Sequence, residues 1–347
     1  MNPMTLGIIM LTLFSGTMIA MLSSHWLPIW MGLEINMLTM IGILMLKRIP
    51  RSTEAPTKYF LTQTTASILL MTAVVINAKL SGQWTITKIF NQPASYIITI
   101  SIAMKLPLAP FQFWVPEVTQ GTPLTSGMTL LTWQNLAPIS ILYHITASTN
   151  HTLLLTMAIL SIMVGRWPGL NQTQLRIIMA YSSITHMAWT TAITMYNSTL
   201  MMLNLTIYQL MTTSMFLLLT VQLSTTILTL SRTWNSMPLL ASLTAMVLLS
   251  TGGLPALSGN LPKWMIIQEM TKISLITTTM MIATLTLLNL YFYTRLIYST
   301  SLTLFSCTIN TKTKWQFKTT TLLPFTPTQI TLSTMIIFLS PILSVLE

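Results

Sequence analysis

KLPLAPFQFWVPE, residues 105–117, and TGGLPALSGNLPKW, residues 251–264, decide the fold of this chain. Both stretches lie in long apolar regions, and both crowd prolines or glycines into a few residues. Proline removes a helix hydrogen-bond donor and clashes with the preceding turn, while glycine lets the backbone leave helical geometry. Each stretch therefore predicts an interrupted helix with a lysine beside the interruption: Lys105 in the first and Lys263 in the second.

The composition around these stretches predicts a membrane protein. Of 347 residues, 52% are hydrophobic and only 6% are charged, and the mean hydropathy is +0.69. A soluble domain carries about 25% charged residues, so lipid must be part of the solvent. The apolar runs are long and do not alternate, which favours helices over a barrel, because backbone groups in lipid need internal partners.

Eleven apolar segments have nearly the length of roughly 20 residues that a bilayer requires. They span about 3–23, 26–46, 59–79, 94–116, 124–145, 152–168, 174–195, 199–222, 238–258, 274–298 and 325–345. The expected fold class is all-α, a polytopic transmembrane bundle of eleven helices.

The two interrupted segments are the fourth and the ninth, five helices apart. An odd offset turns the second copy upside down relative to the first, and paired broken helices are typical of inverted-repeat transporters. We expect two five-helix repeats, residues 1–147 and 148–300, followed by a basic loop and one last helix in residues 301–347. Unrelated proline kinks are the alternative, and they explain the matched pair with lysines poorly.

Lysine and arginine gather in alternate loops, which predicts the orientation by the positive-inside rule. Three cations fall on one side, namely Lys79, Lys88 and Lys272, whereas eleven fall on the other: Lys47, Arg48, Arg51, Lys58, Arg166, Arg176, Arg232, Arg295, Lys312, Lys314 and Lys318. The N-terminus is therefore expected inside and the C-terminus outside. The same bias accounts for the net charge of +11 without a nucleic-acid partner. The loop 299–324 is either a phospholipid site, cardiolipin included, or simply a positive-inside loop.

Three charged residues fall within or beside apolar segments. Glu34 lies near the middle of the second segment, Lys105 midway along the fourth, and Lys263 directly after the second break. A charge at the bilayer centre costs about 2.5–3.5 kcal/mol, so such residues pair or mark an ion path. Glu34 and Lys105 have opposite signs and similar depth, and we expect them to pair and to handle protons. The alternative is a static salt bridge that fixes helix packing.

His186 lies in the seventh segment among hydroxyl side chains. Histidine titrates near pH 6.5 or so, so His186 is either a proton relay or a hydrogen-bonded packing residue. The chain contains no dinucleotide fingerprint, Walker loop, C-x-x-C or H-E-x-x-H, and Cys307 is its single cysteine. We therefore expect no cofactor and no metal in this chain.

Several motifs resemble the family of NADH–ubiquinone oxidoreductase chain 2 from vertebrate mitochondria. They are MLSSHWLPIWMGLEINML, PRSTEAPTKYFLTQ, APFQFWVPEVTQGTPLTSG, GLNQTQLRIIMAYSSITHMAW and LPKWMIIQE. The resemblance covers nearly the whole chain. It implies an antiporter-like core subunit in the membrane arm of complex I, in which FMN, iron–sulfur clusters and ubiquinone belong to other subunits.

The resemblance also implies roles for individual residues. Glu34 and Lys105 match the family's acid–lysine pair, Lys263 the lysine that ends a hydrated central axis, and His186 a polar residue on that axis. The chain departs from the family pattern at Asn135, where WQNLAP replaces WQKLAP. Asparagine can bridge waters but cannot hold a proton charge. Two further departures are Gln112 and Ile177.

The function expected from residues and resemblance together is proton translocation across the mitochondrial inner membrane, coupled to quinone reduction elsewhere in the complex. The N-terminus would lie in the matrix and the C-terminus in the intermembrane space. Expected partners are other core and accessory subunits of the membrane arm, together with phospholipid. Two alternatives stay open: a structural scaffold of the membrane arm, and a stand-alone cation/proton antiporter.

Overall fold

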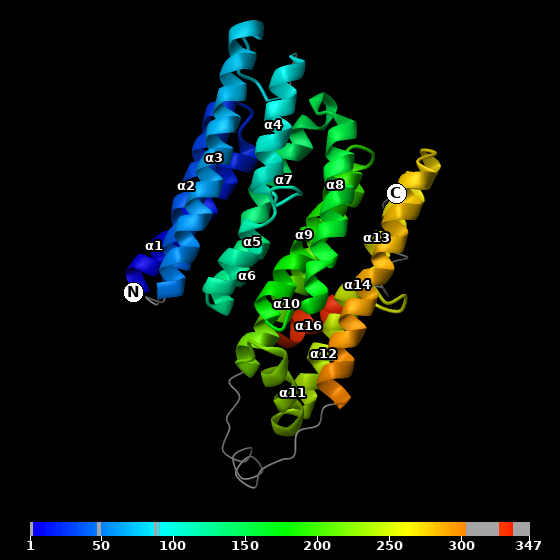
Figure 1. The fold of residues 1–347 in the computed structure, drawn as a ribbon. Coiled ribbons are helices and arrows are strands. Elements are labelled where there is room, and N and C mark those ends of the chain that lie inside the picture. Colours follow the sequence, from blue (N-terminus) through cyan, green and yellow to red (C-terminus); the bar gives the residue numbers. More distant parts are fainter. Residues whose placement is uncertain (1–2, 47–49, 87–88, 90, 303–325, 336–347) are drawn as a thin grey trace. The chain divides into compact units, whose positions relative to one another are not determined.

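The computed structural model describes residues 3–46, 50–86, 89, 91–302 and 326–335. Over these residues the chain is helical, and their only β-type pairings are two isolated bridges, so the expected all-α class is confirmed. The chain divides into two compact units, whose helices are labelled in Figure 1. Unit 1 comprises residues 1–164 and 183–198, and unit 2 comprises residues 165–182 and 199–347.

Unit 1 contains the helices that surround the first break. They are α1 (Pro3–Leu22), α2 (Trp26–Leu44), α3 (Pro50–Ser81), α4 (Gln92–Lys105), α5 (Trp114–Gly121), α6 (Leu124–Thr132), the 3₁₀ turn η1 (Trp133–Asn135), α7 (Leu136–Ile145), the 3₁₀ turn η2 (Thr146–Ser148) and most of α8 (His151–Arg166). Helix α1 packs on α2, and α3 packs on α2, α4 and α5. The first of these contacts depends on small residues, because a Cβ atom at Gly32 would lie 2.8 Å from the carbonyl oxygen of Gly16.

Unit 2 contains the second break. Its elements are the 3₁₀ turn η3 (Pro168–Asn171), the first part of α9 (Leu175–Ile193), α10 (Ser198–Gln222), α11 (Ile227–Ser236), α12 (Pro238–Gly252), α13 (Asn260–Lys272), α14 (Ile276–Leu302) and α16 (Thr326–Met335). Helix α12 packs on α11, α14 and α16.

Both expected interruptions occur. Helix α4 ends at Lys105 and α5 begins at Trp114, while α12 ends at Gly252 and α13 begins at Asn260. In the second break Gly253 adopts a φ of +86°, the left-handed conformation that favours glycine. Gly259 lies so close to the carbonyl oxygen of Ser250 that it leaves no room for a Cβ atom. The breaks therefore come from the local chemistry of proline and glycine.

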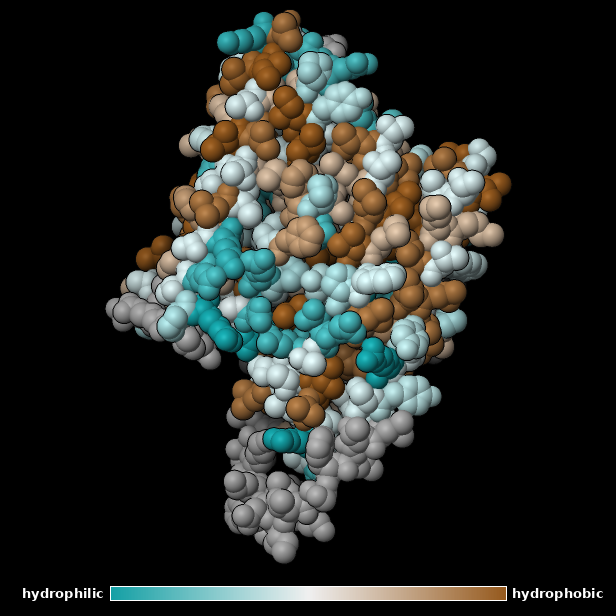
Figure 2. Space-filling model, viewed as in Figure 1, coloured by the Kyte–Doolittle hydropathy of each residue, from teal (hydrophilic) through white to brown (hydrophobic). Residues whose placement is uncertain are grey.

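Apolar side chains are exposed along the helices of both units, as the brown surface in Figure 2 shows. Leu11 is 70% exposed, Leu61 62% and Met280 66%, which is the pattern of a surface facing lipid. Threonine and serine hydroxyls inside the helices donate to carbonyl oxygens three or four residues earlier, as Thr190 does to Met187 at 2.7 Å. These bonds let a threonine-rich helix lie in an apolar medium.

The structure differs from the sequence prediction at several boundaries. Helix α3 begins at Pro50 rather than near residue 59, and the ninth segment continues beyond its break as α13 instead of ending near residue 258. The short helix α11 was not predicted. Helix α13 was not included in the ninth predicted segment because its sequence, NLPKWMIIQEMTK, contains many polar residues. Helix α11 is short and amphipathic, and it begins at a reciprocal capping box between Thr226 and Thr229.

Six helices in the described part of the chain are long and apolar enough to cross a bilayer, while α12 is a shorter apolar helix. The broken helices fall below this length, so the count of eleven spans and the inverted repeats stay predictions. The last expected span is described only over α16. Six expected loop cations lie outside the described residues: Lys47, Arg48, Lys88, Lys312, Lys314 and Lys318.

Candidate functional site

In unit 1, Lys105 is buried at the first break. It is the last residue of α4, and only 4% of its surface is exposed. Helix α5 is tied back to the end of α4 because the Trp114 indole donates to the carbonyl oxygen of Met104 at 3.3 Å. The break therefore places a lysine side chain in the protein interior next to a backbone that has left helical hydrogen bonding.

Glu34 lies part-buried on α2 and interacts attractively with Lys105. Among the ion pairs of the described residues, none joins the Glu34 carboxylate to the Lys105 ammonium within 4.0 Å, and the expected proton-handling pair stays a prediction. Glu34 also acts electrostatically on Tyr59 of α3. The carboxylate therefore stands in a shared polar region, at a distance from both groups, instead of being locked to one lysine.

The polar region continues into η1, the 3₁₀ turn between α6 and α7. The Gln134 amide donates to the Tyr59 hydroxyl at 2.8 Å, and the Asn135 amide donates to the carbonyl oxygen of Leu131 at 2.8 Å. Asn135 is 5% exposed, so the structure places it inside unit 1 with its amide engaged in a local bond.

Several buried side-chain atoms of unit 1 have no protein hydrogen-bond partner among the described residues. They include Asn36 Oδ1, Gln63 Nε2, Gln112 Oε1 and Gln134 Oε1. Buried polar groups are nearly always hydrogen-bonded, to protein or to ordered water. This interior thus has the polarity that internal water requires. His186, buried on the part of α9 that belongs to unit 1, adds an imidazole to the interior of the same unit.

In unit 2, Lys263 is buried beside the second break and is 5% exposed. Its ammonium donates to the carbonyl oxygens of Gly252 at 3.2 Å and Thr251 at 3.4 Å, the last carbonyls of α12. A cation is favoured at a helix C-terminus, where carbonyl groups lack helical partners. The Asn289 amide of α14 also donates to the Thr251 carbonyl, at 3.4 Å. Lys263 is thus held by backbone carbonyls rather than by a carboxylate.

Arg166 is a buried cation that the sequence interpretation missed, because it was counted among the loop cations. It ends α8, is 4% exposed, and repels Lys263 electrostatically. All three guanidinium nitrogens lack a hydrogen-bond partner among the described residues. Arg166 lines a cavity of about 10 Å³ together with Gly169, Ser182 and Asn289, and this cavity has room for about one water. A helix-terminal arginine followed by a tryptophan and a proline gives no sequence signal of burial.

The polar groups of each unit thus form a separate cluster. In unit 1, Glu34 interacts with Lys105 and with Tyr59, whose hydroxyl accepts from Gln134 of η1, while in unit 2 Lys263 lies at the end of α12 with Arg166 nearby. Within the described residues no three histidine, cysteine or acidic side chains gather in a metal-binding cluster. Both clusters combine an ionisable amine with amide and carbonyl groups, which can hold water by hydrogen bonds but cannot themselves carry a proton charge.

Family models match the chain over nearly its whole length. Residues 23–289 match the transmembrane model of NADH:quinone oxidoreductase and Mrp antiporter, and residues 290–344 match the C-terminal model of NADH dehydrogenase subunit 2. NADH-ubiquinone oxidoreductase chain 2 of Dasypus novemcinctus is 62% identical and that of Ovis aries 59% identical, each over 100% of both chains. The chain belongs to the NADH-ubiquinone oxidoreductase chain 2 family.

Solved structures of three other membrane complexes contain chains with a similar fold but low sequence identity. Respiratory complex I from Thermus thermophilus gives a TM-score of 0.81 at 22% identity, covering 96% of this chain and 78% of that one. The Mrp complex from Dietzia sp. gives 0.78 at 15% identity, covering 86% and 61%. An archaeal membrane-bound sulfane sulfur reductase gives 0.80 at 16% identity, covering 96% and 73%. At these identities the likeness shows the fold alone, which this chain shares with chains of the three complexes.

Proposed function

We infer that this chain is a core membrane subunit of respiratory NADH:ubiquinone oxidoreductase and that it translocates protons. Full-length relatives that carry the chain 2 name support membership of the complex. The observation that carries the proton-translocating role is a buried lysine at each of two helix breaks. A buried amine with no carboxylate in direct contact can gain or lose its proton when a neighbouring charge moves.

The proposed architecture is two inverted five-helix repeats, residues 1–147 and 148–300, with a last helix after the basic loop. The corresponding breaks in α4–α5 and α12–α13 support it. The proposed location is the mitochondrial inner membrane, with the N-terminus in the matrix and the C-terminus in the intermembrane space. Other membrane-arm subunits would be its partners, and quinone reduction would take place in chains other than this one.

In the proposed mechanism, Glu34 controls Lys105. The carboxylate attracts the ammonium without contacting it, so a small movement of α2 or α4 changes how strongly the proton is held on Lys105. The amides of Gln134 and Asn135 would orient water beside it, and His186 would relay protons within the same unit. In unit 2, Lys263 would accept and release a proton at the C-terminus of α12.

The test is the assembled complex in proteoliposomes with Lys105→Met, with Lys79→Met as a matched control because Lys79 is exposed near the end of α3. We expect Lys105→Met to lower the proton-to-electron ratio, whereas Lys79→Met leaves it unchanged. The added variant Lys105→Arg retains the positive charge but cannot release its proton near neutral pH. An unchanged ratio in Lys105→Met would refute the role.

A structural scaffold is the second candidate, because Asn135 donates to Leu131 in its own helical segment and has no group that titrates. A scaffold needs the positive charge of Lys105 only for packing, so Lys105→Arg would then pump normally. Proton transport by the isolated chain in liposomes would instead favour the stand-alone antiporter. If the chain translocates protons as a subunit, both Lys105→Met and Lys105→Arg should lower the proton-to-electron ratio of the assembled complex. The isolated chain should then transport no protons.

A further inference from the structure

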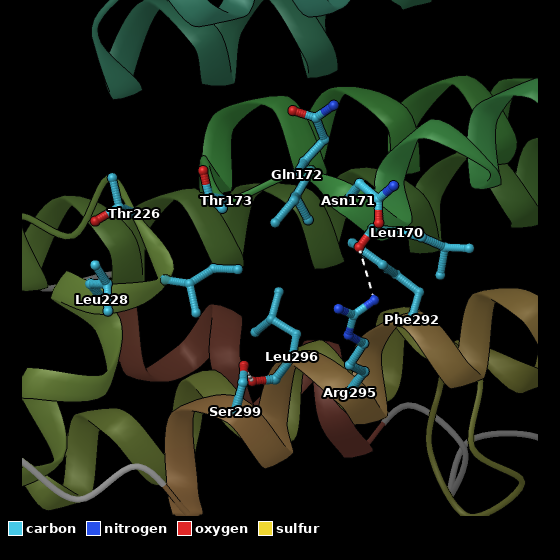
Figure 3. Close-up of a pocket in the computed structure, with 12 residues that line it drawn as sticks. Leu170, Asn171, Gln172, Thr173, Thr226, Leu228, Phe292, Arg295, Leu296 and Ser299 are labelled. Carbon is cyan, nitrogen blue, oxygen red and sulfur yellow. Dashed lines mark hydrogen bonds between the residues drawn. The ribbon is translucent and has the colours of Figure 1, made fainter.

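Unit 2 contains a groove of about 640 Å³ that the proton-translocating role does not use. Figure 3 shows its walls: the connection from η3 to α9, the start of α11, and the last turns of α14. Its lining includes the apolar side chains Ile178, Leu228, Phe292 and Leu296, which come from all three walls, together with polar side chains and Arg295. The volume falls within the range of about 300–1,000 Å³ that is typical of ligand sites.

The walls of the groove are held in place by backbone bonds. The amide of Leu175 donates to Thr225 at 3.0 Å, and the amide of Ile227 donates to Thr173 at 3.1 Å. These bonds join the segment before α9 to the segment before α11, and the capping box at Thr226 fixes the first turn of α11. The groove is therefore formed before any ligand arrives.

Arg295 supplies an unsatisfied charge at the rim. It is exposed on α14, and one guanidinium nitrogen donates to the carbonyl oxygen of Leu170 at 3.2 Å, the dashed line in Figure 3. The remaining donors of its five-donor fork are available. Glu269 is the single carboxylate in the described part of unit 2, and it pairs with Lys272. No acid of the described unit therefore neutralises Arg295.

We propose that this groove binds an anionic glycerophospholipid of the inner leaflet. The phosphate would lie on the guanidinium of Arg295, since arginine matches phosphate geometry with two parallel hydrogen bonds. An acyl chain would lie along Leu228, Phe292 and Leu296. This proposal rests on the orientation proposed above, in which the cations at these helix ends lie on the inner side of the membrane, where headgroups are found.

The test is photocrosslinking in nanodiscs that hold the assembled complex and phosphatidylglycerol with a photoreactive acyl chain. Crosslinked peptides are mapped by mass spectrometry. We expect labels on the groove peptides 170–178 and 292–299. At subsaturating lipid, Arg295→Ala should lower the labelling by about tenfold or more, because it removes both charged hydrogen bonds to the phosphate. Arg51→Ala, which removes an exposed cation from unit 1, should leave it unchanged.

A second variant separates the acyl chain from the phosphate. Leu228 is 61% exposed, so Leu228→Asp can fold, yet it places a carboxylate in the path of the acyl chain. We expect Leu228→Asp to abolish labelling. Suppression of the labelling by inorganic phosphate at the same concentration as the lipid would show that Arg295 binds free phosphate rather than a lipid headgroup. Unchanged labelling in Arg295→Ala would overturn the proposal, as would occupation of the groove by a neighbouring protein or by residues 303–325. Labelling does not depend on pumping, so its failure leaves the proton-translocating role untouched.

Discussion

At the scale of single residues, the chain stabilises two buried lysines in two different ways. Lys105 depends on a carboxylate that it does not touch, whereas Lys263 rests on the terminal carbonyls of α12. Backbone carbonyls hold a cation without a second titratable group. Burial, the carbonyl groups at the helix end and the repulsion by Arg166 therefore act together on the charge of Lys263.

Gly253 makes the position of Lys263 testable. A Cβ atom at Gly253 would lie 2.6 Å from the Lys263 ammonium, and its φ of +86° strains any other residue. Gly253→Ala should destabilise the complex by about 1–2 kcal/mol from backbone strain and should also lower proton-coupled turnover, because the ammonium must move. Thermal unfolding and turnover are the measurements.

Gly82→Ala is the matched control for this prediction. Gly82 has a φ of +68° with nothing within 4 Å of its Cβ position, so it carries the backbone strain without the contact. Equal losses of turnover in the two variants would show that the position of the Lys263 ammonium does not affect turnover.

At the scale of elements, helix α3 packs on both helices that border the first break, α4 and α5. Lys58 of α3 bridges Glu54 and Glu117 at 2.9 Å each, but these side chains are exposed, so the bridge contributes little. The contact between α3 and α5 depends more on Gly121, whose Cβ position lies 2.7 Å from the carbonyl oxygen of Arg51. Gly121→Ala should force the helices apart and cost about 1–3 kcal/mol.

Gly7→Ala controls for the general effect of alanine in a helix. Gly7 lies on α1 with nothing within 4 Å of its Cβ position, so alanine there should stabilise by about 0.5–1 kcal/mol. Thermal unfolding of the two variants gives the difference. The account of α3–α5 packing is wrong if Gly121→Ala unfolds at the same temperature as Gly7→Ala.

The breaks and their lysines were predictable because proline and glycine act locally and because a charge is conspicuous in an apolar segment. The burial of Arg166 was not predictable, since an arginine at a helix end resembles a loop cation until tertiary packing covers it. The hydrogen bond from Lys263 to the carbonyl oxygen of Thr251 joins residues twelve positions apart, so only the folded chain shows it. The opposite charges and similar depth of Glu34 and Lys105 suggest in the sequence that the two residues pair. They do not predict the distance between the two side chains, which form no ion pair within 4.0 Å.

At the scale of the whole molecule, the two compact units each contain one break and one buried lysine. In the proposed mechanism, a chain with only five acids against sixteen basic residues handles protons with one carboxylate near Lys105 and with backbone carbonyls at Lys263. The account accordingly assigns a proton-carrying role to both lysines rather than to the acid–lysine pair alone.

The most direct test compares two lysines on the same helix. Lys263 is buried and Lys272 is exposed, and both lie on α13. The measurement is the proton-to-electron ratio of the assembled complex in proteoliposomes. The account predicts a lower ratio in Lys263→Met and an unchanged ratio in Lys272→Met. An unchanged ratio in Lys263→Met, with normal assembly and turnover, would contradict it.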